Sequence, residues 1–260
     1  MHEGIKVVLS AEPLGTLAGF PITNALLMTW LVMALLIGFA FFFRRSLTLV
    51  PGKLQAVVEW ALTGLYDFVG ETLGSDALTK RFFPLIATIF LFVLVGNELE
   101  FIPGIGSIGI AHGAELIPLL RVPATDLNFT LALAAVAFIA IEVAGIGALG
   151  FLQYGKKFIT IKSPLAFVVG VIELFSEVAR LISFSFRLFG NIFAGEVMVL
   201  VASFFLAYAL PVPIMAFEVF VGFIQAAIFA LLTLFFAKIA TEMHEEHDAP
   251  HAETPLPVPV

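Results

Sequence analysis

The fold of this chain is decided by the stretch Leu181-Ile-Ser-Phe-Ser-Phe-Arg187-Leu-Phe-Gly-Asn191-Ile-Phe-Ala-Gly195-Glu196, which the uncharged run 197–217 follows. About 20 apolar residues are enough to cross a bilayer, and this apolar segment carries Arg187. A guanidinium keeps its proton at any accessible pH. Placing one near the bilayer midplane costs between ~2.5 and more than ~10 kcal/mol. We therefore expect Arg187 to face an anion, a water-filled path or both.

The composition is that of a polytopic membrane protein. Hydrophobic residues make up 60% of the chain and charged residues 13%, whereas soluble domains have roughly 25% charged residues. The chain has no cysteine, which excludes disulfides, thiol catalysis and zinc–thiolate sites. Its start lacks the basic and apolar pattern of a signal peptide. A Walker-type phosphate loop does not occur, so we expect no nucleotide site. We also expect no cofactor, no metal and no nucleic-acid partner.

The hydropathy pattern predicts an all-α fold in a single membrane domain spanning residues 1–260. We expect an outer segment at 1–20, membrane helices within 21–240 and a polar, disordered cytoplasmic tail at 241–260. The amphipathic segment 53–81 is typical of a helix in the membrane interface, with a soluble loop helix as the alternative. A Pro211-Val-Pro213 turn should join the last two segments into a long tilted hairpin. The other expected segments are spans at 22–43, 82–103 and 127–153, a Gly- and Pro-rich loop at 104–123, and hairpin helices at 164–210 and 214–240.

Basic residues predict the orientation of these spans. Most of them flank the spans on one side, and Lys6 and Arg121 fall on the other. Cytoplasmic loops carry an excess of Lys and Arg, so we expect the N-terminus outside and the C-terminus in the cytoplasm. The larger group comprises Arg44, Arg45, Lys53, Lys80, Arg81, Lys156, Lys157, Lys162 and Lys238.

Polar residues follow one face of the expected helix 164–210. At 100° per residue, six of them share one narrow face, with the other five within about 40° of Arg187, whereas Glu196 lies on the opposite face. Glu218 and Gln225 are seven residues apart on the last helix and share a face in the same way. One alternative is that these groups only pair with one another inside a bundle, Arg187 with Glu218 and Arg180 with Glu177 or Glu173. The six are Glu173, Ser176, Arg180, Ser183, Arg187 and Asn191.

The acidic residues of the apolar segments indicate two separate proton paths. In the expected topology Glu98, Glu100, Glu196 and Glu218 lie on the outer side of Arg187. The cytoplasmic side has Glu173 and Ser176. Carboxyl groups in a membrane can exchange protons near neutral pH. Because Glu196 lies opposite the Arg187 face, the outer path does not continue into the inner one, and two half-paths that fail to meet are what rotary proton coupling requires.

Several motifs give the chain its resemblance to subunit a of F-type ATP synthases. Arg187-Leu-Phe-Gly-Asn191 followed by Ala-Gly195-Glu196 resembles the signature of that family. The stretches Asn97-Glu-Leu-Glu-Phe-Ile-Pro103 and Thr125-Asp126-Leu-Asn128-Phe-Thr130 resemble two further family segments. Glu218 and Gln225 match polar positions of the family's last helix, and the resemblance covers most of the chain.

The resemblance implies a non-catalytic stator subunit of a rotary motor in a bacterial inner membrane. Its partners would be membrane lipid, the c-subunit ring, the peripheral-stalk b subunits and the rest of the synthase. Arg187 would separate two half-channels and face the ring carboxylate. Glu218 stands where the family often has His, and two nearby carboxylates, Glu196 and Glu218, are expected to share one proton.

Two other functions, a secondary transporter and a structural scaffold, fit the sequence less well. A secondary transporter would show paired repeats with broken helices, and the sequence has no such pairing. A structural scaffold would leave Arg187, Glu196 and Glu218 unexplained. The sequence leaves open whether the ion is H⁺ or Na⁺, because ion choice rests largely on the partner ring.

Overall fold

The computed structural model describes residues 11–17, 19–102, 105, 108–112, 115–158, 164–207 and 209–242. These residues are mostly helical, with two small antiparallel hairpins, β1–β2 and β3–β4, in the loops. Two short 3₁₀ turns, η1 (Leu99–Phe101) and η3 (Pro123–Thr125), flank the second hairpin. The remaining elements are β1 (Pro13–Leu17), β2 (Phe20–Thr23), α1 (Asn24–Ser46), α2 (Lys53–Leu73), α3 (Asp76–Glu98), β3 (Gly109–His112), β4 (Glu115–Pro118), α4 (Leu127–Leu149), α5 (Phe151–Phe158), α6 (Pro164–Phe205) and α7 (Pro211–Glu242).

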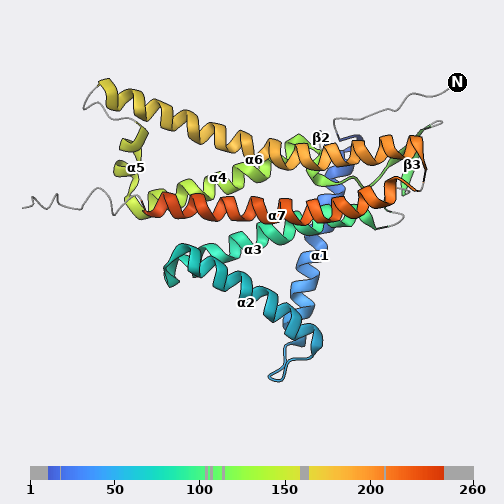
Figure 1. The fold of residues 1–260 in the computed structure, drawn as a ribbon, viewed down its shortest axis with the longest axis horizontal. Coiled ribbons are helices and arrows are strands. Elements are labelled where there is room, and N and C mark those ends of the chain that lie inside the picture. Colours follow the sequence, from blue (N-terminus) through green and yellow to red (C-terminus); the bar gives the residue numbers. More distant parts are fainter. Residues whose placement is uncertain are drawn as a thin grey trace, which may run out of the picture.

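Four helices form the core of the structure. α3 packs against α7, α4 packs against both α6 and α7, and α6 packs against α7. Figure 1 shows these helices along the long axis of the molecule, while α1 crosses that axis steeply and α2 runs back from its far end. The buried residues of α1 lie in its first turns, so most of this helix projects from the core.

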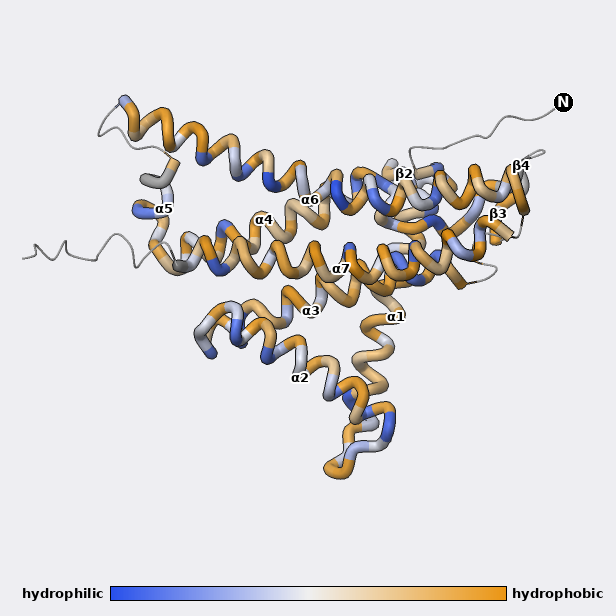
Figure 2. Tube along the Cα trace, in the orientation of Figure 1, coloured by the Kyte–Doolittle hydropathy of each residue, from blue (hydrophilic) through white to orange (hydrophobic). Residues whose placement is uncertain are grey.

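Length and composition confirm the polytopic all-α fold. Four helical segments of the described chain are long and apolar enough to cross a membrane: Asn24–Ser46, Asp76–Phe101, Leu127–Leu149 and Pro211–Thr241. Figure 2 shows their hydrophobic colouring and the polar interruptions on α6. The 42 residues of α6 span about 63 Å at 1.5 Å per residue. A hydrocarbon core of about 30 Å can hold such a helix only if it is strongly tilted.

The segment expected to be one helix at 53–81 is two helices. α2 ends at Leu73, and Gly74 adopts a left-handed conformation with φ of 65° while its N–H bonds to the carbonyl of Gly70. Glycine takes this conformation without the steric cost that a Cβ imposes. α3 therefore begins at Asp76, six residues before the expected span. Most of α2 is exposed, which fits the amphipathic pattern, and its place in the membrane interface stays a prediction.

Other boundaries also differ from expectation. The Pro211-Val-Pro213 stretch begins α7 rather than forming the turn, because a proline at the start of a helix lacks only an N–H that would have no helical partner. α4 ends at Leu149, before Gly150 with φ of 79°, and the short α5 was not predicted. Hairpin β3–β4 lies within the expected loop 104–123. The expected tail lies outside the described residues from 243 onward, as do Lys6 and Lys162.

The segment before α1 lies at the same end of the molecule as the loop that carries Arg121. The side chain of Asn24 is fully buried. Its amide nitrogen donates to the carbonyl of Pro118 at 3.3 Å, and its oxygen accepts from the backbone N–H of Glu12 at 3.2 Å. The two segments thus share one side, as the basic residues predicted, and the assignment of that side to the outside stays a prediction.

Candidate functional site

Arg187 lies in the middle of α6 with an exposed side chain. Ser183 and Asn191, one turn away on either side, are exposed too, while Phe184 and Leu188 are buried against α7 and α4. Within the described part of the chain, no hydrogen bond or ion pair joins Arg187 to another residue. The alternative of an Arg187–Glu218 pair is therefore not seen there. This face presents a fixed cation to whatever lies outside the chain.

Glu218 enters the site from α7 through close contact with a glycine of α6. A Cβ placed on Gly195 would overlap the carboxyl group of Glu218. The missing side chain at position 195 is thus what lets this half-buried carboxyl group lie against α6. Gly195 and Glu196 are consecutive, so the contact also places Glu218 within electrostatic range of the Glu196 carboxylate.

Gly195→Ala is expected to displace the Glu218 carboxyl group and to slow proton transport by roughly 100-fold, the usual contribution of a well-placed proton-transfer group. Measurement of passive proton flux in membranes that hold the assembled complex tests this. Gly190→Ala is the matched control, because a Cβ there meets nothing within 4 Å. Equal flux in both variants would contradict the role of the close contact.

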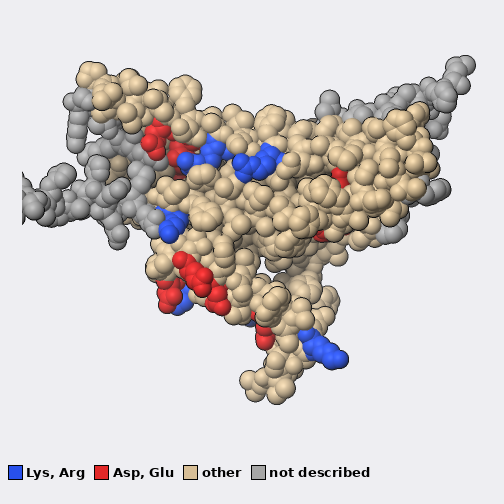
Figure 3. All heavy atoms as spheres, in the orientation of Figure 1, with Lys and Arg blue, Asp and Glu red and all other residues tan. Residues whose placement is uncertain are grey.

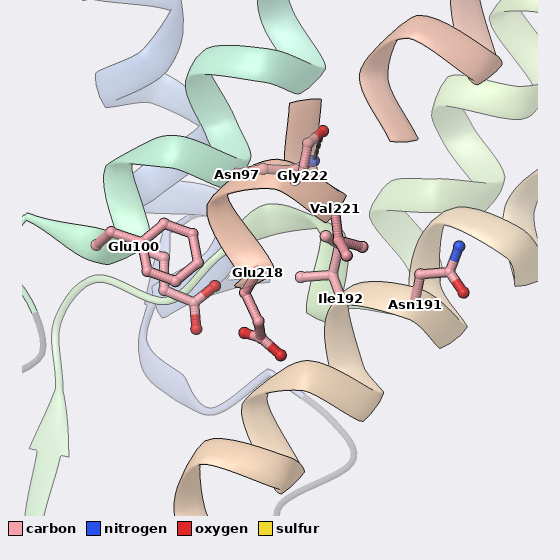
Figure 4. A pocket seen from close by; sticks show the side chains of 8 residues that line it. Asn97, Glu100, Asn191, Ile192, Glu218, Val221 and Gly222 are labelled. Carbon is pink, nitrogen blue, oxygen red and sulfur yellow. Dashed lines mark hydrogen bonds between the residues drawn. The ribbon is translucent and has the colours of Figure 1, made fainter. Parts of the chain in front are cut away.

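A small cavity lies beside Glu218 and has room for about one water molecule. Figure 4 shows the carboxyl groups of Glu100 and Glu218 pointing toward one another across it, with Asn191 on the far side. Three helices contribute to the cavity, so only the folded bundle forms it. Its lining consists of Asn97, Glu100, Phe101, Asn191, Ile192, Glu218, Val221 and Gly222.

Amide side chains connect the helices around this cavity. The buried Asn97 of α3 donates to the carbonyl of Gly222 at 3.4 Å, which ties α3 to α7. Asn191 of α6 donates to Gln225 of α7 at 2.7 Å, and Gln225 is only 1% exposed. The structure therefore brings together Asn97, Asn191, Glu218 and Gln225, four of the residues that the sequence proposed.

Arg121 joins the candidate site, although the sequence did not predict it there. Its guanidinium lies 3.3 Å from the carboxylate of Glu196, with side chains 9% and 40% exposed respectively. Arg121 also donates from Nε to the hydroxyl of Thr125 at 3.0 Å. From the sequence, Arg121 was interpreted only as a charge in a loop. Its position four residues before Thr125 was the available signal.

The Asp126-to-Thr130 stretch has a structural explanation. Asp126 caps α4 by accepting from the backbone N–H of Asn128 at 2.9 Å. The hydroxyl groups of Thr130 and Ser185 are 2.9 Å apart and link α4 to α6. The second of these contacts holds α6 against α4 two residues from Arg187.

The polar stripe of α6 is less uniform than the helical spacing predicted. Ser176 is exposed and donates to the carbonyl of Ile172 at 2.9 Å, and Glu173 is half-buried. Arg180 instead turns inward and pairs with Glu177 at 2.6 Å, as the pairing alternative held. Much of this helix is exposed on other faces as well, Val178 and Phe186 among them.

A buried tyrosine lies near this ion pair. Tyr154 of α5 is 4% exposed, and its ring occupies the space that a Cβ on Gly145 of α4 would need. Burial, followed by a hydrogen bond to Glu142 and the charges of Glu142 and Glu177, raises the pKa of the Tyr154 phenol. The phenol therefore stays neutral at physiological pH.

Charged groups are unevenly distributed over the surface. On the face that Figure 3 shows, most Lys, Arg, Asp and Glu side chains stand toward the end that carries α5 and on the α1–α2 arm. The end with the α6–α7 turn is almost uncharged, apart from a few partly covered acidic groups. This end of the visible face is thus mostly apolar.

Comparisons with known proteins agree on one family. The family model described as "ATP synthase A chain" matches residues 26–238. ATP synthase subunit a of Moorella thermoacetica is 34% identical over 84% of this chain and 90% of the relative. The same subunit of Gloeobacter violaceus is 36% identical over 86% of each chain. ATP synthase subunit a 1 of Pelobacter propionicus is 37% identical over 86% of this chain and 89% of the relative.

Proposed function

Because this chain belongs to the ATP synthase A chain family, we propose that it conducts protons across a coupling membrane through two offset half-channels. The flow would be coupled to the rotation of a c-subunit ring that lies against the exposed face of α6. The chain would be the stator side of this motor, held by peripheral-stalk b subunits within the synthase. In a bacterial inner membrane, its N-terminus would lie outside and its C-terminus in the cytoplasm.

The observation that carries this proposal is the setting of Arg187. We place α6 in the membrane, where an exposed guanidinium needs an anion or water beside it. Arg187 has no hydrogen-bond or ion-pair partner within the described residues. A carboxylate on a neighbouring ring would supply that partner. The fixed positive charge would keep the ring carboxylate deprotonated as it passes.

The two half-channels would lie on either side of Arg187. The outer one would use the cavity at Glu218, with Glu196, Asn97, Asn191 and Gln225 around it. The inner one would use Glu173, Ser176 and Ser183 along the exposed face of α6. Arg187 lies between the two groups and would prevent a proton from passing directly from one to the other.

Cysteines placed singly at 173, 176 and 183 are expected to react with a small hydrophilic thiol reagent, and the reaction should block proton flux. The native chain has no cysteine to interfere. A cysteine at 180 should react as well. Position 180 lies on the same face of α6, and the substitution removes the side chain that pairs with Glu177. Labelling rates and proton flux in the assembled complex test the inner path.

Two sets of controls distinguish positions that water reaches from positions that are exposed on this chain but face lipid. Cysteines at Val178 and Phe186, which are 50% and 53% exposed, should react poorly, because apolar positions on a membrane helix face lipid rather than water. A cysteine at the buried Leu188 should also stay unreacted. Equal labelling at all positions would show a solvated helix, and no labelling at any of them would show a dry seam; either result contradicts the inner path.

A further inference from the structure

Arg180 and Arg187 leave α6 from the same face, but their guanidinium groups lie in different surroundings. They are seven residues apart, which is two turns and about 20° of rotation. Arg187 is exposed, whereas the Arg180 side chain is 22% exposed. The difference lies in the neighbours of the two guanidinium groups rather than in their positions on the helix.

Glu177 and Phe236 hold Arg180 against the bundle. Nη1 of Arg180 lies 2.6 Å from a carboxylate oxygen of Glu177, whose side chain is 4% exposed. The guanidinium carbon lies 3.9 Å from the ring centre of Phe236 on α7. A charge-assisted bond and a cation–π contact together fix the group in a position turned away from the Arg187 face.

Apolar and aromatic side chains surround the buried carboxylate of Glu177, whose side chain is 4% exposed. Phe236 packs against Phe184 with ring centres 5.6 Å apart, and Phe184 packs against Phe229 at 5.3 Å. Tyr154 is buried nearby and feels the charges of both Glu177 and Arg180. A carboxylate in such a place attracts a guanidinium more strongly than one in water.

We propose that Glu177 is a positioning residue that keeps the Arg180 guanidinium off the inner proton path. This inference rests on the proposed function, because it assumes that protons leave along Glu173, Ser176 and Ser183. Arg180 stands between Ser176 and Ser183 in the sequence of this face. Released from Glu177, its long side chain reaches the exposed surface and places a second fixed cation on the path.

A second cation would slow the exit of protons without changing the barrier at Arg187. At an effective dielectric constant near 20, a fixed charge about 10 Å from a moving proton changes a rate roughly tenfold. Glu177→Gln should therefore reduce passive proton flux by roughly this factor. The amide keeps the size and hydrogen-bonding capacity of the carboxyl group, so the packing around it is preserved.

The double variant Glu177→Gln/Arg180→Gln makes the test specific. We expect it to recover most of the wild-type flux, since it removes the released cation, and Arg180→Gln alone should stay near wild type. A merely structural role for the pair predicts the reverse, with the double variant at least as slow as Glu177→Gln. Flux is measured in membranes that hold equal amounts of the assembled complex, and that reverse order would overturn the proposal.

Phe236→Leu gives a second release of Arg180 that leaves Glu177 in place. We expect a severalfold loss of flux, again recovered by Arg180→Gln. Phe229→Leu is the matched control, because Phe229 belongs to the same aromatic stack and the described contacts of Arg180 are to Glu177 and Phe236. Equal losses in Phe236→Leu and Phe229→Leu, without recovery by Arg180→Gln, would indicate lost packing and overturn the proposal even if Glu177→Gln failed to assemble.

Arg187→Ala in the same membranes distinguishes a failure of the proposed function from a failure of this inference. Normal coupled transport in Arg187→Ala would contradict the proposed function itself. Loss of coupling in Arg187→Ala, together with unchanged flux in Glu177→Gln and Phe236→Leu, would leave the proposed function standing and remove this inference alone.

Discussion

Arg187→Ala is expected to abolish ATP synthesis driven by a proton gradient while the complex still assembles. Arg187 is exposed and makes no hydrogen bond or ion pair within the described residues, so its loss breaks no internal contact of that kind. The charge removed is one that would hold a passing carboxylate deprotonated, and the loss of about 3 kcal/mol of such stabilisation corresponds to roughly 100-fold in rate. Synthesis and ATP-driven proton pumping should fall by at least about that factor.

Two further variants show whether the charge or the size of Arg187 matters. Arg187→Lys should restore function only in part, because an ammonium lacks the planar fork and can lose its proton when desolvated. Phe186→Ala, at an exposed apolar position next to it, should synthesise ATP normally. Near-normal synthesis in Arg187→Ala, with the variant present in the complex at wild-type amounts, would make the central proposal wrong.

Glu218→Gln is expected to reduce proton uptake from the outer side by roughly 100-fold, the second largest effect. The Glu218 carboxyl group lies against Gly195 and faces Glu100 across the cavity. An amide can occupy the same space and keep hydrogen bonds, but it cannot bind and release a proton at physiological pH. Proton flux as a function of outside pH measures the effect.

Glu196→Gln should slow uptake less than Glu218→Gln does. The ion pair of Glu196 with Arg121 already offsets part of the charge of this carboxylate. The double variant Glu196→Gln/Glu218→Gln should be at most slightly slower than Glu218→Gln alone. Two carboxyl groups that share one proton act as a unit. Unchanged flux in the double variant would reduce both residues to structural hydrogen bonding.

The sequence predicted the membrane helices because hydropathy and helical period act over many residues at once. The 42-residue α6, the α7 that returns from it and the expected spans before them all correspond to observed helices. The wrong boundaries lie at single residues, at Gly74, Gly150 and Pro211. There a positive φ or a missing N–H decides where a helix ends or begins, and one residue gives a weak signal within a long apolar run.

What the sequence determined by itself about the site is the exceptional position of Arg187 and the chemistry near it. A charged group inside an apolar segment of a membrane protein is costly, so the residue identity alone marks Arg187 as a candidate functional residue. The amides and carboxyl groups at Asn97, Asn191, Glu218 and Gln225 could be selected for the same reason. The tertiary structure brings these four together from α3, α6 and α7.

Only the tertiary structure decided which polar groups pair. Helical spacing placed Arg180 beside Arg187 on one face, yet Arg180 turns inward to Glu177 and to Phe236, 56 residues further along the chain. Arg121 reaches Glu196 from a loop 75 residues away. Periodicity fixes where a side chain leaves its own helix. The direction in which a long side chain then extends depends on the partners that packing brings within reach, and a single helix does not contain that information.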